Sequence, residues 1–159
     1  MSMRVDPRAS SLARLDRLDP YRGFAPLAIR VFLGVFLLYM AQDNVFSAAR
    51  MTEFERFLAA NHVPAPALAA RVSVYAQLVC GALVLVGVFT RWAALVMIVN
   101  FMVAIVGVHL KLPFRTFLEP CAMLACAVAL FLGGPGRLAI DTWWARRSPD
   151  GAGSAAPAR

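Results

Sequence analysis

The chain has 159 residues, of which 60% are hydrophobic and only 16% are charged. Soluble globular domains carry about 25% charged residues, so this composition excludes a water-soluble monomer and indicates a protein whose solvent is largely lipid. The net charge of +7 comes mostly from arginines near the two termini, and their expected counter-charge is anionic lipid rather than nucleic acid.

Four apolar stretches are long enough to cross a bilayer of about 30 Å. Only Thr90 and Arg91 separate the second stretch from the third, and such short links are typical of an up-and-down antiparallel bundle. We therefore predict an all-α integral membrane protein, a four-helix antiparallel bundle with interfacial amphipathic helices. The predicted spans are residues 27–46, 72–89, 92–110 and 114–133.

Basic residues are unevenly distributed between the two sides that these spans define. Eleven lie on the side of both termini and five on the opposite side. Because loops rich in arginine and lysine stay in the cytoplasm, we expect cytoplasmic termini, an uncleaved first span and an inner-membrane location. The expected domains are a cytoplasmic segment (1–26), a transmembrane domain (27–141), and an interfacial anchor with a disordered tail (142–159). Arg30, near the cytoplasmic start of the first span, is expected to extend toward lipid phosphate.

Two short amphipathic elements are expected outside the spans. After a capping-box pattern at residues 52–55, apolar residues recur at helical spacing and predict an interfacial helix that ends near Asn61. After Gly134-Pro135-Gly136 ends the fourth span, Trp143 and Trp144 lie beside arginines, as in an interfacial anchor. The apolar positions of the first element are Met51, Phe54, Phe57 and Leu58.

Small residues repeat along single faces of the last three spans. Membrane helices pack through such faces, so we expect these stripes to face the interior of the bundle. The second span offers Ala76, Cys80 and Gly87, the third Ala93, Asn100, Ala104 and Gly107, and the fourth Ala122, Cys126, Ala129 and Gly133.

Polar residues at membrane depth are unfavourable unless they are paired or face a cavity. Asp43 closes the first span, Gln77 lies within the second, His109 ends the third and Glu119 opens the fourth, so antiparallel threading brings all four toward the outer leaflet. We expect them to line an outward polar pocket for a headgroup, a quinone ring or a sulfur oxyanion, or to pass protons. The alternative is that the charged members are interfacial residues solvated at helix ends.

Several membrane activities need residues that this chain lacks. Dithiol chemistry needs close cysteine pairs, whereas Cys121 and Cys126 lie about 140° apart on an ideal helix. Haem held between helices needs two facing histidines, but His62 and His109 are both on the outer side. We therefore expect no haem or metal, and no complete set of groups for an independent enzyme.

Several segments follow one another in a recognisable order. The first span contains residues 30–39, Val63-Pro64 precedes the second, residues 76–87 lead to Thr90-Arg91, and Gly134-Pro135-Gly136-Arg137 is followed by Asp141. In this order, over roughly residues 27–141, the chain resembles the DoxX family of small four-helix membrane proteins from bacteria and archaea. The sequence departs from the family pattern around residues 41–44, where a glycine and a lysine are replaced, and at Gln77, which replaces a common glutamate.

The resemblance implies a membrane subunit associated with quinol oxidase, thiosulfate:quinone or thiol redox chemistry. We therefore expect an accessory subunit of a quinone- or thiol/sulfur-linked membrane redox complex, with quinone as the candidate cofactor. Its expected partners are membrane lipids, redox subunits or a second copy of the chain. The alternative is a non-catalytic membrane scaffold or a small-solute carrier, in which the same polar residues are packing groups or a transport path.

Overall fold

The computed structural model describes residues 16–108, 110 and 112–147, and this part of the chain contains helices and no strand. Four of its helices are long and apolar enough to cross a membrane, which confirms the predicted all-α fold. His109 and the predicted disordered tail lie outside the described residues. The helices are η1 (Asp16–Phe24), α2 (Ala25–Phe46), α3 (Ala48–Ala60), α4 (Pro66–Val86), α5 (Thr90–Gly107), α6 (Phe114–Gly133) and α7 (Ile140–Arg147).

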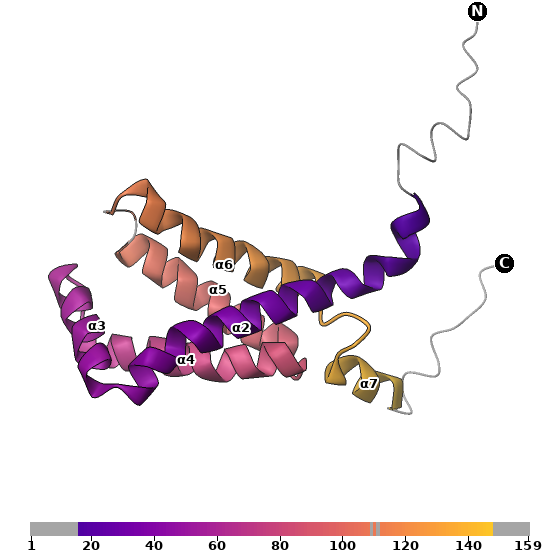
Figure 1. Ribbon diagram of the computed structural model, residues 1–159, viewed down its shortest axis with the longest axis horizontal. Coiled ribbons are helices and arrows are strands. Elements are labelled where there is room, and N and C mark those ends of the chain that lie inside the picture. Colours follow the sequence, from indigo (N-terminus) through magenta and orange to yellow (C-terminus); the bar gives the residue numbers. More distant parts are fainter. Residues whose placement is uncertain (1–15, 109, 111, 148–159) are drawn as a thin grey trace, which may run out of the picture.

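The four spanning helices form two pairs. Helix α2 packs along α4, and α5 packs along α6. The two pairs lie close together near α7 and diverge toward the opposite end, where α3 lies (Figure 1). We call these the α7 end and the α3 end of the bundle.

Close packing between α2 and α4 depends on two glycines. A methyl group on Gly34 would lie 2.8 Å from Cβ of Leu85, and one on Gly81 would lie 2.9 Å from Cβ of Leu37. Both distances are shorter than a van der Waals contact, so the absence of a side chain lets the two backbones approach, as is common between membrane helices. The main core of the bundle is made of buried residues from all four spans: Leu33, Leu37, Cys80, Val84, Ala93, Ala94, Met97, Phe101, Met123, Ala127 and Leu130.

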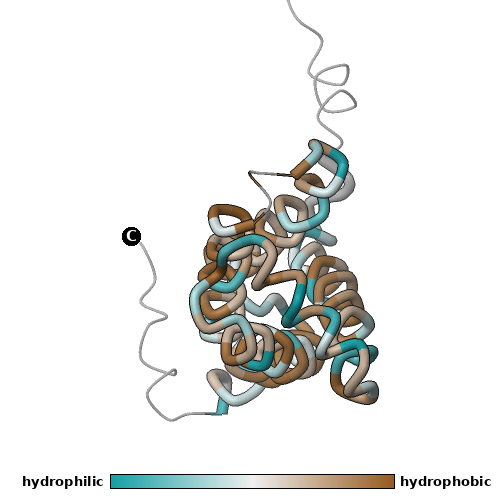
Figure 2. The backbone as a smooth tube through the Cα atoms, turned by 90° about the vertical axis from the view of Figure 1, so that its left-hand side faces the viewer, coloured by the Kyte–Doolittle hydropathy of each residue, from teal (hydrophilic) through white to brown (hydrophobic). Residues whose placement is uncertain are grey.

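The outer surface of the spans is apolar. Seen from the α3 end, the helices are coloured predominantly as hydrophobic (Figure 2). Large apolar side chains such as Phe32, Trp92 and Leu132 are more than half exposed. We assign this surface to contact with lipid, since a bilayer is the solvent that such a surface requires.

The predicted small-residue stripe is confirmed on α4 and wrong on α6. Cys80 and Gly87 of α4 are buried, whereas Ala122 and Ala129 of α6 are exposed, as is Gly133. The buried face of α6 instead follows Pro120, Met123, Ala127 and Leu130. On α6 the buried face therefore combines large and small side chains, and the small-residue stripe lies on the outer surface.

The second and third spans begin and end differently from the prediction, whereas α6 covers the predicted residues 114–133. Helix α4 starts at Pro66 because a proline at the first helical position sacrifices no hydrogen bond. The turn to α5 is formed by residues 87–89, with positive φ at Gly87 (83°) and Phe89 (49°). Thr90 and Arg91, expected to form this turn, belong to α5.

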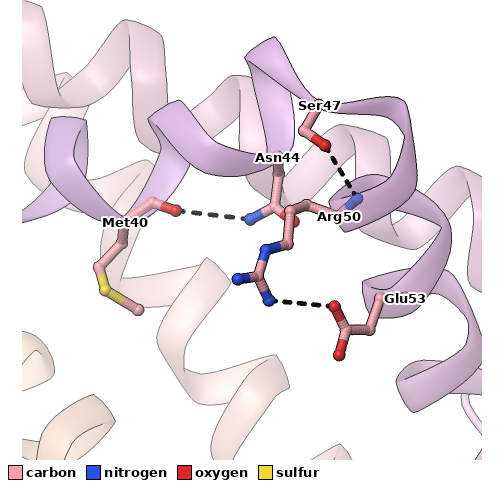
Figure 3. Close-up of polar contacts among 5 residues, drawn as sticks. All are labelled: Met40, Asn44, Ser47, Arg50 and Glu53. Carbon is pink, nitrogen blue, oxygen red and sulfur yellow. Dashed lines mark hydrogen bonds and ion pairs between the residues drawn. The ribbon is translucent and has the colours of Figure 1, made fainter.

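The amphipathic helix α3 is present, but its predicted capping box is wrong. Ser47 is the N-cap, and its hydroxyl accepts a hydrogen bond from the Arg50 amide (3.4 Å; Figure 3). Thr52 lies inside the helix, where its hydroxyl donates to the Ala48 carbonyl at 2.9 Å. The expected apolar face is confirmed by the burial of Leu58.

Candidate functional site

A cavity of about 570 Å³ lies where the two helix pairs diverge, and we call it the α3-end cavity. Its walls are mainly apolar, with side chains such as Phe36, Phe101 and Met123. Every spanning helix also contributes at least one polar side chain. These are Asn44 from α2, Ser73 and Gln77 from α4, Asn100 from α5 and Glu119 from α6.

Asn100 is the most unusual residue of this lining. Its Nδ2 atom is buried and has no hydrogen-bond partner among the described residues. A buried donor left in this state costs about 1–3 kcal/mol, so it is retained only where something else offsets the cost. Because the Nδ2 atom has almost no accessible surface, a ligand's acceptor would reach it only after the Asn100 side chain turns further toward the cavity.

A second amide faces the same cavity from α4. Gln77 is half-buried, and its Nε2 donates to the Ser73 hydroxyl at 3.3 Å. A serine hydroxyl on a helix can accept this bond and still rotate toward a further partner. The cavity therefore contains neutral hydrogen-bonding groups from two different helices.

Glu119 adds a carboxylate to the same lining. It lies near the start of α6, directly before the buried Pro120, and is exposed at the α3 end. Of the four residues expected to form one pocket, the structure thus brings Gln77 and Glu119 together in one cavity. His109 lies outside the described residues.

Asp43 is placed elsewhere. It lines an adjoining, shallower hollow of about 290 Å³ between α2 and α3, together with Arg50 and Glu53. This hollow shares Met40, Asn44 and Phe54 with the α3-end cavity. Within this hollow Arg50 pairs with Glu53 at 3.1 Å, and the Asn44 amide donates to the Met40 carbonyl at 3.4 Å (Figure 3). Asn44 lines both this hollow and the α3-end cavity, whereas Asp43 lines the hollow alone.

The sequence pattern did not identify Asn100 as a site residue. Its spacing from Ala93, Ala104 and Gly107 made it one member of a packing stripe. The signal that singles it out is its chemistry, because it is an amide well inside an apolar span. That signal could have placed Asn100 beside Gln77 in the list of candidates.

The α7 end of the bundle has a different polar arrangement, centred on Arg30. Its side chain is only 1% exposed. The expectation that Arg30 extends toward lipid phosphate is wrong, because its guanidinium bonds to backbone carbonyls inside the protein. The last carbonyls of α4 have no partner within the helix, and the guanidinium has five N–H donors to offer. Arg30 donates to the carbonyls of Val84 (2.9 Å), Leu85 (3.0 Å), Pro135 (3.1 Å) and Leu138 (3.0 Å).

Asp141 completes this arrangement from the beginning of α7. Its two carboxylate oxygens accept hydrogen bonds from the amides of Phe89 and Thr90, each at 2.8 Å. These are free amides at the start of α5, where a negative charge is stabilising. The Asp141 amide in turn donates to the Gly87 carbonyl at 3.0 Å. The C-terminal segment that carried the family resemblance thus joins α2, α5 and α7 through hydrogen bonds, and we call this arrangement the fastening of the α7 end.

The α7 helix itself lies beyond this fastening. Trp143 and Trp144 are each 49% exposed, and the Arg147 guanidinium lies 3.7 Å from the centroid of the Trp143 ring. This pairing of exposed aromatic and basic groups is the one expected for an interfacial anchor.

Few groups elsewhere could hold a cofactor. In the described ranges, no three His, Cys, Asp or Glu side chains lie close enough together to ligate a metal ion. Cys80, Cys121 and Cys126 are all free thiols. The α3-end cavity is therefore the strongest candidate site, and its chemistry suits a largely apolar ligand that forms a few hydrogen bonds.

Comparison with known proteins gives one match. The family model described as DoxX matches residues 25–110, a range that includes Arg30, Gln77 and Asn100 and ends before Glu119. No curated protein and no solved structure matches the chain.

Proposed function

Because the chain belongs to the DoxX family, we propose that this multi-pass membrane protein is an accessory subunit of a membrane redox complex and binds a quinone in the α3-end cavity. The arginine distribution supports an inner-membrane location with both termini in the cytoplasm.

The observation that carries the proposal is the buried Asn100 amide in an apolar-walled cavity. A quinone is a flat ring with two carbonyl acceptors and an apolar tail, so it needs few donors and extensive apolar walls. Asn100 would donate to one ring carbonyl, and the Gln77–Ser73 pair supplies a second polar group. The cavity volume of about 570 Å³ lies within the range of ordinary small-molecule sites.

Glu119 supplies the ionisable group of the same lining. Reduction of a bound quinone to the quinol takes up two electrons and two protons, and a carboxylate at the exposed end of the cavity is suited to exchange protons with water. The described residues offer no pair of cysteines joined by a disulfide and no metal-ligand cluster of their own. We therefore assign the electron donor to a partner subunit and the binding role to this chain.

The packing of the bundle supports binding over transport. Toward the α7 end, Leu37, Met97 and Leu130 are at most 1% exposed and fill the centre. Beyond them, the α2 and α4 backbones are joined by the buried Arg30. A continuous channel would need a path to the second side of the membrane, whereas these buried side chains close the centre of the bundle.

The test is to extract the protein from its native membrane in lipid nanodiscs and to identify what co-purifies by mass spectrometry. We expect quinone close to one per chain together with a redox subunit. A matched preparation of Asn100→Leu should lose the quinone and keep the subunit. Recovery of phospholipid and copies of this chain alone would contradict the proposal and favour a scaffold.

A further inference from the structure

The rim of the α3-end cavity lies on the lipid-facing side of two helices. Val72 of α4 and Val99 and Val103 of α5 all line the cavity, yet they are 59%, 57% and 63% exposed. A side chain that lines a cavity and is also more than half exposed lies at its opening. The opening is therefore between α4 and α5, on the outer surface of the bundle.

The course of the two helices explains this opening. Helices α4 and α5 meet at the turn formed by residues 87–89 and diverge toward the α3 end (Figure 1). Packing is tightest next to the turn, where Thr90 and Val84 are fully buried. Further from the turn the two helices separate, and valines border the gap.

The α3 end itself is covered by a second apolar cluster. Leu58 of α3, Ala70 of α4 and Val108 are buried together, and Phe54 and Leu112 pack against them. This cluster joins α3 to the start of α4 and to Val108, the C-cap of α5. The way into the cavity along the bundle axis is therefore narrowed by apolar side chains, while its side toward lipid is open.

We infer that the α3-end cavity takes its ligand sideways from the bilayer, through the opening between α4 and α5, and that the ligand's apolar tail stays in the lipid. The inference rests on the proposed function and adds the route by which the quinone enters and the place of its tail. Its head lies against Asn100 and Gln77, where the hydrogen-bonding groups are. Its tail passes between Val72 and Val103, where the rim offers only apolar contact.

The experiment compares two benzoquinones, only one of which has a long apolar tail. Decylubiquinone has a ten-carbon tail, and duroquinone is a fully substituted benzoquinone without one. The protein is placed in phosphatidylcholine nanodiscs, and the rise of its thermal midpoint is followed as each probe is added. The variant Val72→Trp narrows the opening, Val103→Trp narrows it from the other side, and Leu132→Trp is the control on an exposed position of α6.

We expect either tryptophan at the rim to raise the half-saturating amount of decylubiquinone at least tenfold while changing that of duroquinone less than twofold. Leu132→Trp should leave both values unchanged. Lateral entry would be overturned if the half-saturating amounts of the two probes changed equally, or if that of decylubiquinone changed in neither rim variant. Either result would leave the proposed quinone site in place. If the unmodified protein responds to neither probe, the proposed function fails and the inference fails with it.

Discussion

The two ends of the bundle differ in whether their polar groups have hydrogen-bond partners. At the α7 end, Arg30 donates to four carbonyls and Asp141 accepts from two amides. At the α3 end, the Asn100 Nδ2 atom is buried without a partner in the described part of the chain, and Glu119 is exposed. Polar pairing at one end holds four helices together, whereas unsatisfied polar groups at the other end leave a place for a ligand.

The Thr90 hydroxyl is also buried without a partner within the described residues, and it lies at the α7 end. Its backbone amide, however, is held by Asp141 at 2.8 Å. The difference between the ends therefore concerns what surrounds the unsatisfied atom. Thr90 is fully buried in packed side chains, whereas Asn100 faces a cavity.

The largest effect is expected from breaking the α7 end. Arg30→Leu leaves four carbonyls without their donors and should lower the free energy of unfolding by more than about 3 kcal/mol. Equilibrium unfolding in mixed micelles measures this change. Arg56→Leu, on an exposed position of α3, is the control and should stay within about 0.5 kcal/mol of the parent. Equal stability of the two variants would show that the Arg30 contacts do not hold this end.

A smaller loss is expected from the cap on α5. Asp141→Asn keeps one acceptor oxygen but removes the charge at the helix N-terminus, so it should lower stability by about 1–2 kcal/mol. The same unfolding assay applies, with Glu53→Gln on the exposed surface as the matched control. If both carboxamide substitutions had the same effect, the carboxylate of Asp141 would be unimportant for the fastening.

The α3 end should respond with the opposite sign. Asn100→Leu removes a buried donor that is unsatisfied in the described structure, and it should raise stability by up to about 1 kcal/mol while abolishing quinone binding. Thermal midpoints with and without decylubiquinone measure both effects. A variant that is less stable than the parent and still binds the quinone would reverse the assignment of Asn100.

The smallest stability effect is expected at Glu119. Glu119→Gln changes an exposed side chain, so the free energy of unfolding should move by less than about 0.5 kcal/mol. Its contribution is expected in the response to decylubiquinone, which should weaken more than in the matched variant Glu53→Gln. Identical responses would remove Glu119 from the site and leave it as a solvated residue at a helix end.

Some of this architecture could be predicted from the sequence. The four spans follow from hydropathy and length alone, and the break after Gly133 follows from Gly134-Pro135-Gly136. The role of Arg30 could not be predicted, because two of its acceptors lie more than a hundred residues away at Pro135 and Leu138. The charge of Arg30 and its position near the start of a span are compatible both with an arginine that faces lipid and with a buried one.

The candidate site was predicted only in part, for a geometric reason. A helical wheel shows which residues share a face, but it does not show which face lines the cavity between diverging helices. Asp43 and Asn44 are neighbours in sequence, yet only Asn44 lines the α3-end cavity. Asn100 was grouped with packing residues for the same reason. The divergence of the helix pairs, which decides both cases, is a tertiary property.

The most direct test of the account is to find where a quinone binds. A photoreactive azido-ubiquinone, added to the protein in nanodiscs, labels the side chains around its head, and mass spectrometry of the digested chain locates them. We expect labels within residues 72–77 and 96–104, on the parts of α4 and α5 that line the α3-end cavity. Labels confined to the α7 end, around Arg30 and Asp141, would contradict the division of the bundle into a fastened end and a binding end.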